Sequence, residues 1–251
     1  MILGFVGAGS MATAMARGWA RAAEHPRMLF CDADKARAER LAASAGGETR
    51  PDLRSLRDDS DALLLAVKPG ALEAVAGELK GRSPAIISVL AATSVERLRG
   101  AFPSSPILRV MPNQPVEVGR GVLVHAPPTA GAEHLVALLR PLGTRVEVPE
   151  DQIDAAMAVM SCSPAYVALF AQALAGAGAD NGLDESLSLE LVAGTLEGTA
   201  ELLRRHDPVA VQRAVAPPGG ATEAGLERLE RDGFAPAIEG AVEASLKRFR
   251  Q

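Results

Sequence analysis

Near the N-terminus, six residues between an apolar run and a helical pattern carry the clearest chemical signal: Gly7, Ala8, Gly9, Ser10, Met11 and Ala12. Two glycines at this spacing, with a small residue three positions later, let a strand turn sharply, let the backbone approach a phosphate and let the next helix pack closely. The free N–H groups and the dipole of that helix favour an anion. The spacing predicts a loop that binds the pyrophosphate of a dinucleotide. The alternative is a glycine turn that serves packing alone.

Asp32 lies twenty residues after Ala12, at the end of the next apolar run. An acid at this position commonly receives the ribose hydroxyls of a dinucleotide and disfavours a 2′-phosphate, so Asp32 favours NADH. Lys35, Arg37 and Arg40 follow closely and could bind that phosphate, although a solvated helix face explains them more simply. The residues leave the cofactor as NADPH or NADH.

The histidines and cysteines indicate no further chemistry. The four histidines do not fall within helical or turn spacing of one another or of a cysteine, so we expect no metal site. Cys31 and Cys162 are far apart and lack CxxC spacing, which is typical of free thiols in a reducing compartment. We therefore expect a cytoplasmic protein, with Cys162 either a small buried filler or a reactive thiol.

The elements that must position these residues change character near residue 150. Before it, short apolar runs alternate with amphipathic stretches, the pattern of βαβ units. Strands are predicted at Ile2–Val6, Met28–Cys31, Ala62–Val67, Ala85–Val89, Ile107–Met111, Gly121–His125 and Arg145–Val148. Beyond it, only helical patterns remain. The predicted fold is α/β: residues 1–150 form a Rossmann-type doubly wound, dinucleotide-binding domain, and residues 151–251 form an all-α substrate and dimerisation domain.

Helix starts are marked by capping residues and prolines. Their positions are the capping-box sequence Thr93–Glu96, Pro69, Ser163-Pro164, Asp184 and Asp207-Pro208. A last helix is predicted over Phe234–Phe249.

Composition restricts the partners. The chain of 251 residues has a net charge of −5, so no overall positive field attracts nucleic acid or anionic lipid. No apolar run approaches the length of about 18 residues that a membrane span requires. The C-terminal helices carry Ala and Leu on more than one face, which a single layer of helices could not bury. We therefore expect a small-molecule substrate, no nucleic-acid or membrane partner, and a homodimer or higher homo-oligomer formed through these helices.

Three further segments complete a family pattern. Ala66, Val67, Lys68 and Pro69 end one strand, residues 109–115 (Arg-Val-Met-Pro-Asn-Gln-Pro) end a later one, and residues 218–222 (Pro-Gly-Gly-Ala-Thr) open a helix. With residues 4–11 and 233–245, they make the whole chain resemble the pyrroline-5-carboxylate reductase family. The resemblance implies NAD(P)H-dependent reduction of a cyclic imine to proline, by a Rossmann domain followed by a helical domain that dimerises.

The resemblance also implies roles for single residues. Gly219 and Gly220, at a helix N-terminus, would hold the substrate carboxylate. Thr222 would lie beside the imine nitrogen, and its alternative role is a helix-capping hydroxyl. Residues 66–69 match the family's cofactor-contacting segment, in which Lys68 could equally be an exposed charge.

Several positions depart from the family pattern. Met160-Ser161-Cys162-Ser163 stands where the family usually has Ser-Gly-Ser-Gly, and residues 213–218 lack its polar side chains. Single changes are Leu53 for Asn, Ala92 for Gly, Gln114 for Thr and Gly176 for Asp. Two alternatives therefore stay open: a reductase of the same family for another imine or small oxo acid, and a dinucleotide-binding paralogue without catalysis.

Overall fold

The computed structural model describes residues 1–81 and 84–249 and consists of two compact units. The N-terminal unit comprises residues 1–164 and the end of the last helix from Leu246, and the helical unit comprises Ala165–Ser245. This division follows contacts within the chain. The boundary near residue 150 between a nucleotide domain and a dimerisation domain remains a prediction.

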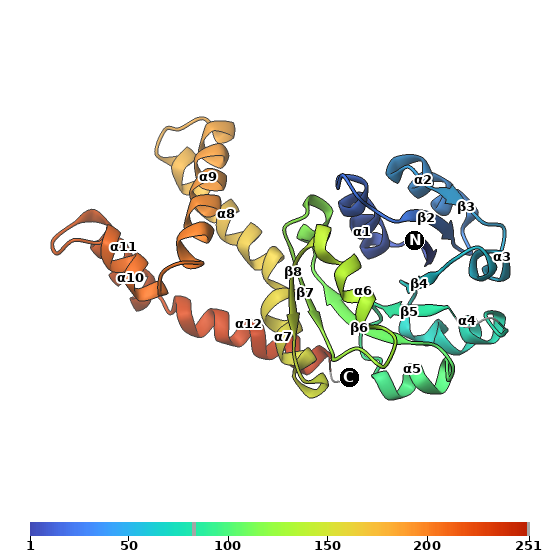
Figure 1. Ribbon diagram of the computed structural model, residues 1–251. Helices are drawn as coiled ribbons and strands as arrows, with labels where there is room; N and C mark the ends of the chain where they lie inside the picture. Colours follow the sequence, from blue (N-terminus) through green and yellow to red (C-terminus); the bar gives the residue numbers. More distant parts are fainter. Residues whose placement is uncertain (82–83, 250–251) are drawn as a thin grey trace. The chain divides into compact units, whose positions relative to one another are not determined.

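The N-terminal unit is built on one eight-stranded sheet (Figure 1). Its strands are β1 (Ile2–Val6), β2 (Arg27–Cys31), β3 (Glu48–Thr49), β4 (Ala62–Leu65), β5 (Ala85–Ser88), β6 (Ile107–Pro112), β7 (Gly121–His125) and β8 (Gly143–Glu147). They lie in the order β3-β2-β1-β4-β5-β6-β7-β8. All seven predicted strands are present, and the two-residue strand β3 was not predicted. The order of the first six strands is that of a doubly wound dinucleotide-binding sheet.

The parallel pattern is interrupted once, where β6 and β7 pair antiparallel. A parallel connection needs a crossover of about a dozen residues or more. Residues 113–120 between these strands form only the short 3-10 helix η2 (Gln114–Val118), so the chain turns straight back. The expectation of parallel βαβ units is therefore wrong for this pair.

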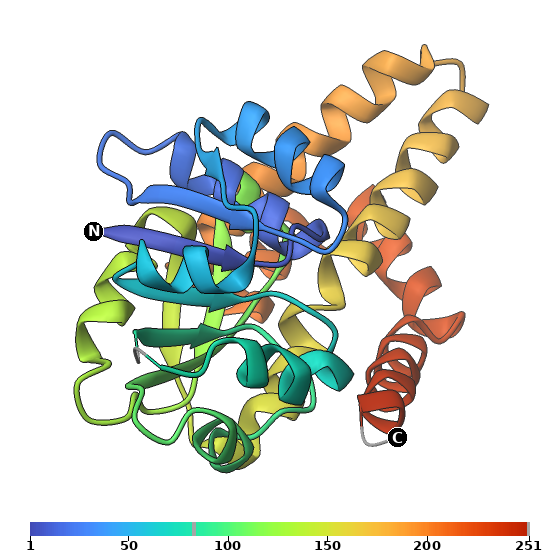
Figure 2. The same cartoon turned by 90° about the vertical axis from the view of Figure 1, so that its right-hand side faces the viewer.

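Helices cover both faces of the sheet, as Figure 2 shows. One face packs against α1 (Ser10–Ala20), α2 (Lys35–Ala45) and α6 (Glu133–Leu138), and the other against α3 (Leu53–Asp58), α4 (Leu72–Glu78) and α5 (Val95–Ala101). Trp19 is fully buried on the first face, where its Nε1–H donates to the carbonyl of Leu138 at 2.9 Å. Leu56 and Leu98 are fully buried on the second. Each face therefore has its own apolar core.

The remaining helices follow β8. They are α7 (Ile153–Met160), α8 (Ser163–Asp180), α9 (Glu185–Leu203), α10 (Pro208–Val215), α11 (Ala221–Arg231) and α12 (Phe234–Phe249). Asp184 and Asp207 cap α9 and α10 as predicted, each accepting hydrogen bonds from two backbone N–H groups. Two other expected caps are wrong. Ser94, not Thr93, caps α5, and the Ser163 hydroxyl donates back to the carbonyl of Val159 instead of accepting a forward N–H.

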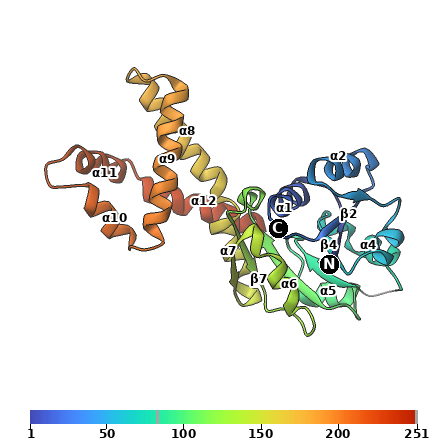
Figure 3. The same cartoon turned by 45° about the horizontal axis from the view of Figure 1, so that its top comes forward.

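The helical unit buries few side chains within the single chain. Of its residues, all of which the structure describes, only Ser188 and Val192 are buried. Figure 3 shows α8 beside α9, where the Ser188 hydroxyl donates to the carbonyl of Ala175 at 2.7 Å. Its exposed large apolar side chains are Val167, Leu169, Phe170, Leu174, Leu183, Leu187, Leu189, Leu191, Leu202, Leu203, Val209, Val215, Leu226, Leu229, Phe234 and Ile238.

One helical stretch, Glu150–Asp180, is long and apolar enough to cross a membrane by length and composition alone. It is interrupted between α7 and α8. The expectation that no apolar run approaches the length of a membrane span is therefore wrong for this stretch, although a core helix of a soluble protein passes the same test.

Candidate active site

Gly7 lies where the ends of three strands meet. Its N–H donates to the carbonyl of Cys31 at the end of β2, at 2.8 Å. Its φ is +98°, and a Cβ on this residue would lie 2.7 Å from the carbonyl oxygen of Ala66, just after β4. Both the left-handed backbone and the lack of space require glycine. Gly7 therefore makes the sharp turn that the sequence predicted.

Gly9 is a glycine for a different reason. A Cβ at this position would meet no protein atom within 4 Å, so the fold itself leaves room for a side chain. Gly9 is the N-cap of α1, which has no side-chain cap, whereas Asp34 and Asp52 cap α2 and α3. Ala12, in the first turn of α1, is fully buried. Free N–H groups and open space at a closely packed helix start fit the pyrophosphate of a dinucleotide.

Asp32 is held against the glycine loop. Its Oδ2 accepts the N–H of Ala8 at 2.7 Å, and its Oδ1 accepts the N–H of Asp34 at 2.8 Å. Arg37 lies further away, with Nη1 at 3.9 Å from Oδ2. No local pattern in the sequence indicates the hydrogen bond between Ala8 and Asp32. Because of this bond, Asp32 supports the loop as well as being a candidate ligand of the ribose.

Two cavities flank the loop. One, of about 440 Å³, lies beyond the carboxyl ends of β1, β2 and β4, and its lining includes Gly7, Asp32 and Val67. The other, of about 570 Å³, borders Gly9 and Ser10. Ligands of doubly wound sheets bind at this edge. The structure thus brings together the predicted loop, Asp32 and the segment after β4.

The segment after β4 opens a helix, as Pro69 predicted. Lys68 precedes Pro69, the first residue of the 3-10 helix η1 (Pro69–Ala71) that leads into α4. Ala66 and Val67 are half-buried, and Lys68 is exposed. The role of Lys68 remains a prediction.

Asn113 was part of the motif at residues 109–115, but no role was predicted for it. The side chain is buried, and its Nδ2 donates to the carbonyl of Met160 at 3.0 Å. Its Oδ1 accepts the N–H of Val122 in β7 at 2.8 Å. Asn113 therefore ties the sheet to the end of α7, directly before the altered residues 161–163.

An ion pair between the buried Arg109 and the partly exposed Glu150 fixes the start of the segment that leads to α7. Arg109 of β6 donates from Nη1 to Oε1 of Glu150 at 2.7 Å. The same carboxylate accepts the N–H of Val95, the first residue of α5, at 2.6 Å. Loss of the Glu150 carboxylate would leave the buried guanidinium of Arg109 without its counter-charge, so this contact is structural.

The second predicted group of residues surrounds the start of α11, in the helical unit. Gly220 is the N-cap without a side-chain cap, and Thr222 is the exposed second residue of the helix. The capping alternative for Thr222 is therefore wrong. The N–H of Gly219, where φ is +77°, donates to Oε2 of Glu223 at 2.7 Å. A carboxylate of the chain itself thus already accepts an N–H beside the predicted carboxylate site.

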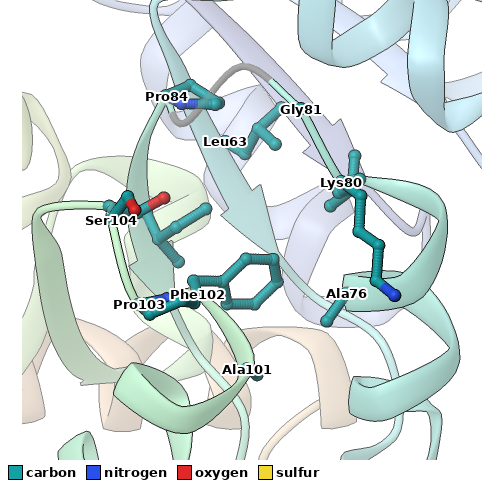
Figure 4. A pocket seen from close by; sticks show the side chains of 12 residues that line it. Leu63, Ala76, Lys80, Gly81, Pro84, Ala101, Phe102, Pro103 and Ser104 are labelled. Atoms are coloured by element: carbon teal, nitrogen blue, oxygen red, sulfur yellow. The ribbon is translucent and has the colours of Figure 1, made fainter.

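A further cavity, of about 200 Å³, lies between α4 and α5 (Figure 4). The ring of Phe102 projects into it, and Leu63 and Ser104 also line it. Leu63 is near the amino end of β4, so this cavity lies at the edge of the sheet opposite the glycine loop. Among residues 1–81 and 84–249, no three His, Cys, Asp or Glu side chains form a group that could hold a metal ion.

The chain is similar over nearly its whole length to known reductases. A pyrroline-5-carboxylate reductase of Synechocystis sp. is 37% identical over 262 residues, covering 99% of this chain and 97% of the relative. The chain belongs to the pyrroline-5-carboxylate reductase family. A family model described as pyrroline-5-carboxylate reductase dimerisation matches residues 150–251, and one described as NADP oxidoreductase coenzyme F420-dependent matches residues 2–92.

Solved reductase structures share the whole fold. The 1-pyrroline-5-carboxylate reductase of Streptococcus pyogenes superposes with a TM-score of 0.88 at 28% identity, covering 99% of this chain and 98% of the other. The pyrroline carboxylate reductase of Plasmodium falciparum, with NADP bound, gives 0.87 at 28% identity, covering 99% and 97%. The predicted α/β fold with a helical second part is confirmed.

The altered positions of this reductase-family chain have local structural effects. Ala92, in place of a family glycine, is the one non-glycine residue with positive φ among residues 1–81 and 84–249, at +50°. The Ser161 hydroxyl lies 2.8 Å from Sδ of Met160, and that of Ser163 bonds to Val159, so both are engaged within their own segment.

Proposed function

We propose that this protein reduces 1-pyrroline-5-carboxylate to proline, the last step of proline biosynthesis, with NADPH or NADH as hydride donor. The observation that carries the proposal is similarity to reductases of this name over nearly the entire chain, and the open space beside Gly9 in the glycine loop agrees with it.

The nucleotide half of the proposed site belongs to the N-terminal unit. Gly7, Ala8, Gly9, Ser10, Met11 and Ala12 would hold the pyrophosphate, and Asp32 the ribose. Ala66, Val67, Lys68 and Pro69 would contact the cofactor at the carboxyl edge of the sheet. When bound, the dihydronicotinamide supplies the hydride.

The substrate half belongs to the helical unit. The imine carbon is already electrophilic, so the protein mainly has to orient it, and positioning supplies most of the catalysis. Gly219 and Gly220, at the N-terminus of α11, and the dipole of that helix would hold the carboxylate. The Thr222 hydroxyl, free of a capping role, would donate a hydrogen bond to the substrate at the imine nitrogen.

Assembly and location belong to the same proposal. Family membership supports a homo-oligomer. We infer a homodimer or higher homo-oligomer formed through the C-terminal helices, because their apolar side chains are exposed in the single chain. Residues 1–150 would then act as the nucleotide domain and residues 151–251 as the substrate and dimerisation domain. Both cysteines are free, which fits a reducing compartment, and we place the protein in the cytoplasm.

The test is a reductase assay with purified protein. Pyrroline-5-carboxylate is mixed with NADPH or NADH, nucleotide oxidation is followed by absorbance, and proline is quantified by amino-acid analysis. Proline formed in equal amounts with oxidised nucleotide, at ordinary enzyme rates, is the expected result. Nucleotide binding without proline formation would overturn the proposal.

The altered residues 160–163 favour one second candidate, a reductase of the same family for another imine or small oxo acid. In that case, a panel of cyclic imines and oxo acids would reveal a better substrate. Nucleotide binding without turnover of any member would instead indicate a non-catalytic paralogue.

A further inference from the structure

The cavity beyond the carboxyl ends of β1, β2 and β4 is lined by more negative than positive side chains, although the dinucleotide that we propose for it is itself an anion. Its apolar wall includes Leu53, Val67 and Val75. Its charged lining consists of three carboxylates, those of Asp32, Asp52 and Glu78, and the ammonium group of Lys35. Since Gly7 and Asp32 both line it, this cavity would take the adenosine half of a nucleotide whose pyrophosphate binds at the glycine loop.

The carboxylate of Asp32 is suited to hydroxyl groups. Each of its oxygens accepts one backbone N–H, from Ala8 and from Asp34. A carboxylate oxygen can accept two hydrogen bonds, so each retains one acceptor site. Ribose hydroxyls can donate to these sites. A 2′-phosphate at neutral pH is an anionic acceptor, so it would face Asp32 with like charge and no proton to donate.

At the neighbouring helix start, the arginine close to Asp32 already faces two acids. Asp34 caps α2, and its Oδ1 accepts the N–H of Arg37 at 3.2 Å. The guanidinium of Arg37 lies between two acids, with Nη2 at 3.7 Å from Asp34 and Nη1 at 3.9 Å from Asp32. Its positive charge is therefore offset by carboxylates on the same side of the site.

The buried thiol of Cys31 responds to the field in this cavity. Its pKa is raised above the ordinary value, first by burial and then by the negative charges of Asp52, Asp32 and Glu78, with Lys35 acting in the opposite direction. The lining of the cavity therefore holds three carboxylates against one ammonium group.

We propose that Asp32, Asp34, Asp52 and Glu78 make this protein select NADH over NADPH by excluding the 2′-phosphate. The inference rests on the proposed dinucleotide binding, and it sets this chain apart from the Plasmodium falciparum relative, whose structure holds NADP. It concerns the nucleotide alone and does not depend on which imine is reduced.

The test measures nucleotide binding by the full-length protein without any imine. Dissociation constants for NADH and NADPH are determined from nucleotide fluorescence and checked with NAD⁺ and NADP⁺ by calorimetry. NADH should bind at least about tenfold more tightly than NADPH, a difference of about 1.4 kcal/mol. The preference should narrow in high salt, because repulsion between charges is screened. Equal binding, or tighter binding of NADPH, would overturn the proposal.

Variants that each remove one negative charge show which carboxylates cause the preference for NADH. Asp34→Ser keeps a helix-capping side chain and Glu78→Gln keeps the shape of the cavity wall, and each should improve NADPH binding about threefold relative to NADH. Asp32→Asn should weaken NADH binding most and bring the two affinities close together. The matched control is Glu73→Gln, which makes the same charge change on α4 outside the cavity lining, where Glu73 pairs with Arg97.

If Glu78→Gln alters the preference no more than Glu73→Gln does, and Asp34→Ser leaves it unchanged, the assignment to these carboxylates is wrong. The Asp32→Asn result is used only if this variant unfolds at the same temperature as wild type. If it does not, Asp34→Ser and Glu78→Gln decide the test. Selective NADH binding without proline formation would contradict the proposed function and leave this inference intact. Proline formation with tighter NADPH binding would do the reverse.

Discussion

The N-terminal unit and the helical unit differ in how far one chain can bury its own apolar side chains. In the N-terminal unit, Trp19, Phe30 and Leu64 are fully buried. In the helical unit, Ser188 and Val192 are the only buried residues, although most of the exposed large apolar side chains belong to it. Because burial of apolar surface dominates the free energy of folding, the first unit is stabilised from within, whereas the second requires apolar surface from elsewhere.

This difference divides the residues proposed to bind the nucleotide from those proposed to bind the substrate. The glycine loop and Asp32 belong to the unit that is complete in one chain. Gly219, Gly220 and Thr222 belong to the unit that is not. Nucleotide binding should therefore survive the loss of assembly, while reduction of the imine should not.

The largest effect is expected from charges placed on the helical unit. Leu187→Arg combined with Leu191→Arg replaces two exposed apolar side chains one turn apart on α9 with cations. If this surface is buried between subunits, ultracentrifugation should show monomers at micromolar concentration and reductase activity should fall by about a hundredfold or more. Nucleotide affinity should change less than about twofold, since the N-terminal unit is untouched.

The control for that experiment is Glu197→Arg, at an exposed charged residue of the same helix. It should leave assembly and activity close to wild type. A double-leucine variant that still sediments as wild type would contradict the comparison between the units.

Within the N-terminal unit, Gly9 and Gly7 should separate binding from stability. Gly9→Val fills space that no protein atom approaches within 4 Å, so thermal unfolding should be nearly unchanged while nucleotide affinity falls by about a hundredfold or more. Unchanged nucleotide affinity in Gly9→Val would refute the assignment of the loop.

Gly7→Ala places a Cβ against Ala66 at positive φ and should lower the free energy of unfolding by about 2 kcal/mol or more.

In the helical unit, Thr222→Ala should lower kcat by about tenfold to a hundredfold, because the variant loses a hydroxyl that donates to the substrate. Nucleotide affinity and thermal unfolding should match wild type, since Thr222 does not cap α11. Thr222→Ser should restore most of the activity. Steady-state kinetics with wild-type kcat in the alanine variant would remove Thr222 from the mechanism.

The smallest effect concerns Ala92. Its φ of +50° is unfavourable for a residue with a Cβ, so Ala92→Gly should raise the free energy of unfolding by about 0.5–1 kcal/mol, measured by chemical denaturation. The control, Ala91→Gly, sits at a residue without positive φ and should be neutral or destabilising by up to about 1 kcal/mol. Equal effects in both variants would show that Ala92 is not strained.

The sequence by itself determined the features that depend on local chemistry. The glycine loop, seven of the eight strands, the caps at Asp184 and Asp207 and the extent of α12 follow from local properties. These properties are backbone freedom, side-chain capping and the spacing of apolar residues, all of which operate within a few positions. Where two local signals competed, as at Thr93 and Ser94, the prediction was off by one residue.

Tertiary structure alone decided the contacts between distant segments. Ala8 reaches Asp32, Asn113 reaches Met160, and Arg109 reaches Glu150 only after the strands have paired and the helices have packed. No local pattern encodes these pairs, because each forms when separate elements bury their apolar faces against a common sheet. The charge balance around the cavity beside the glycine loop arises in the same way, from acids directly after β2, at the N-cap of α3 and on α4 that only the fold brings together.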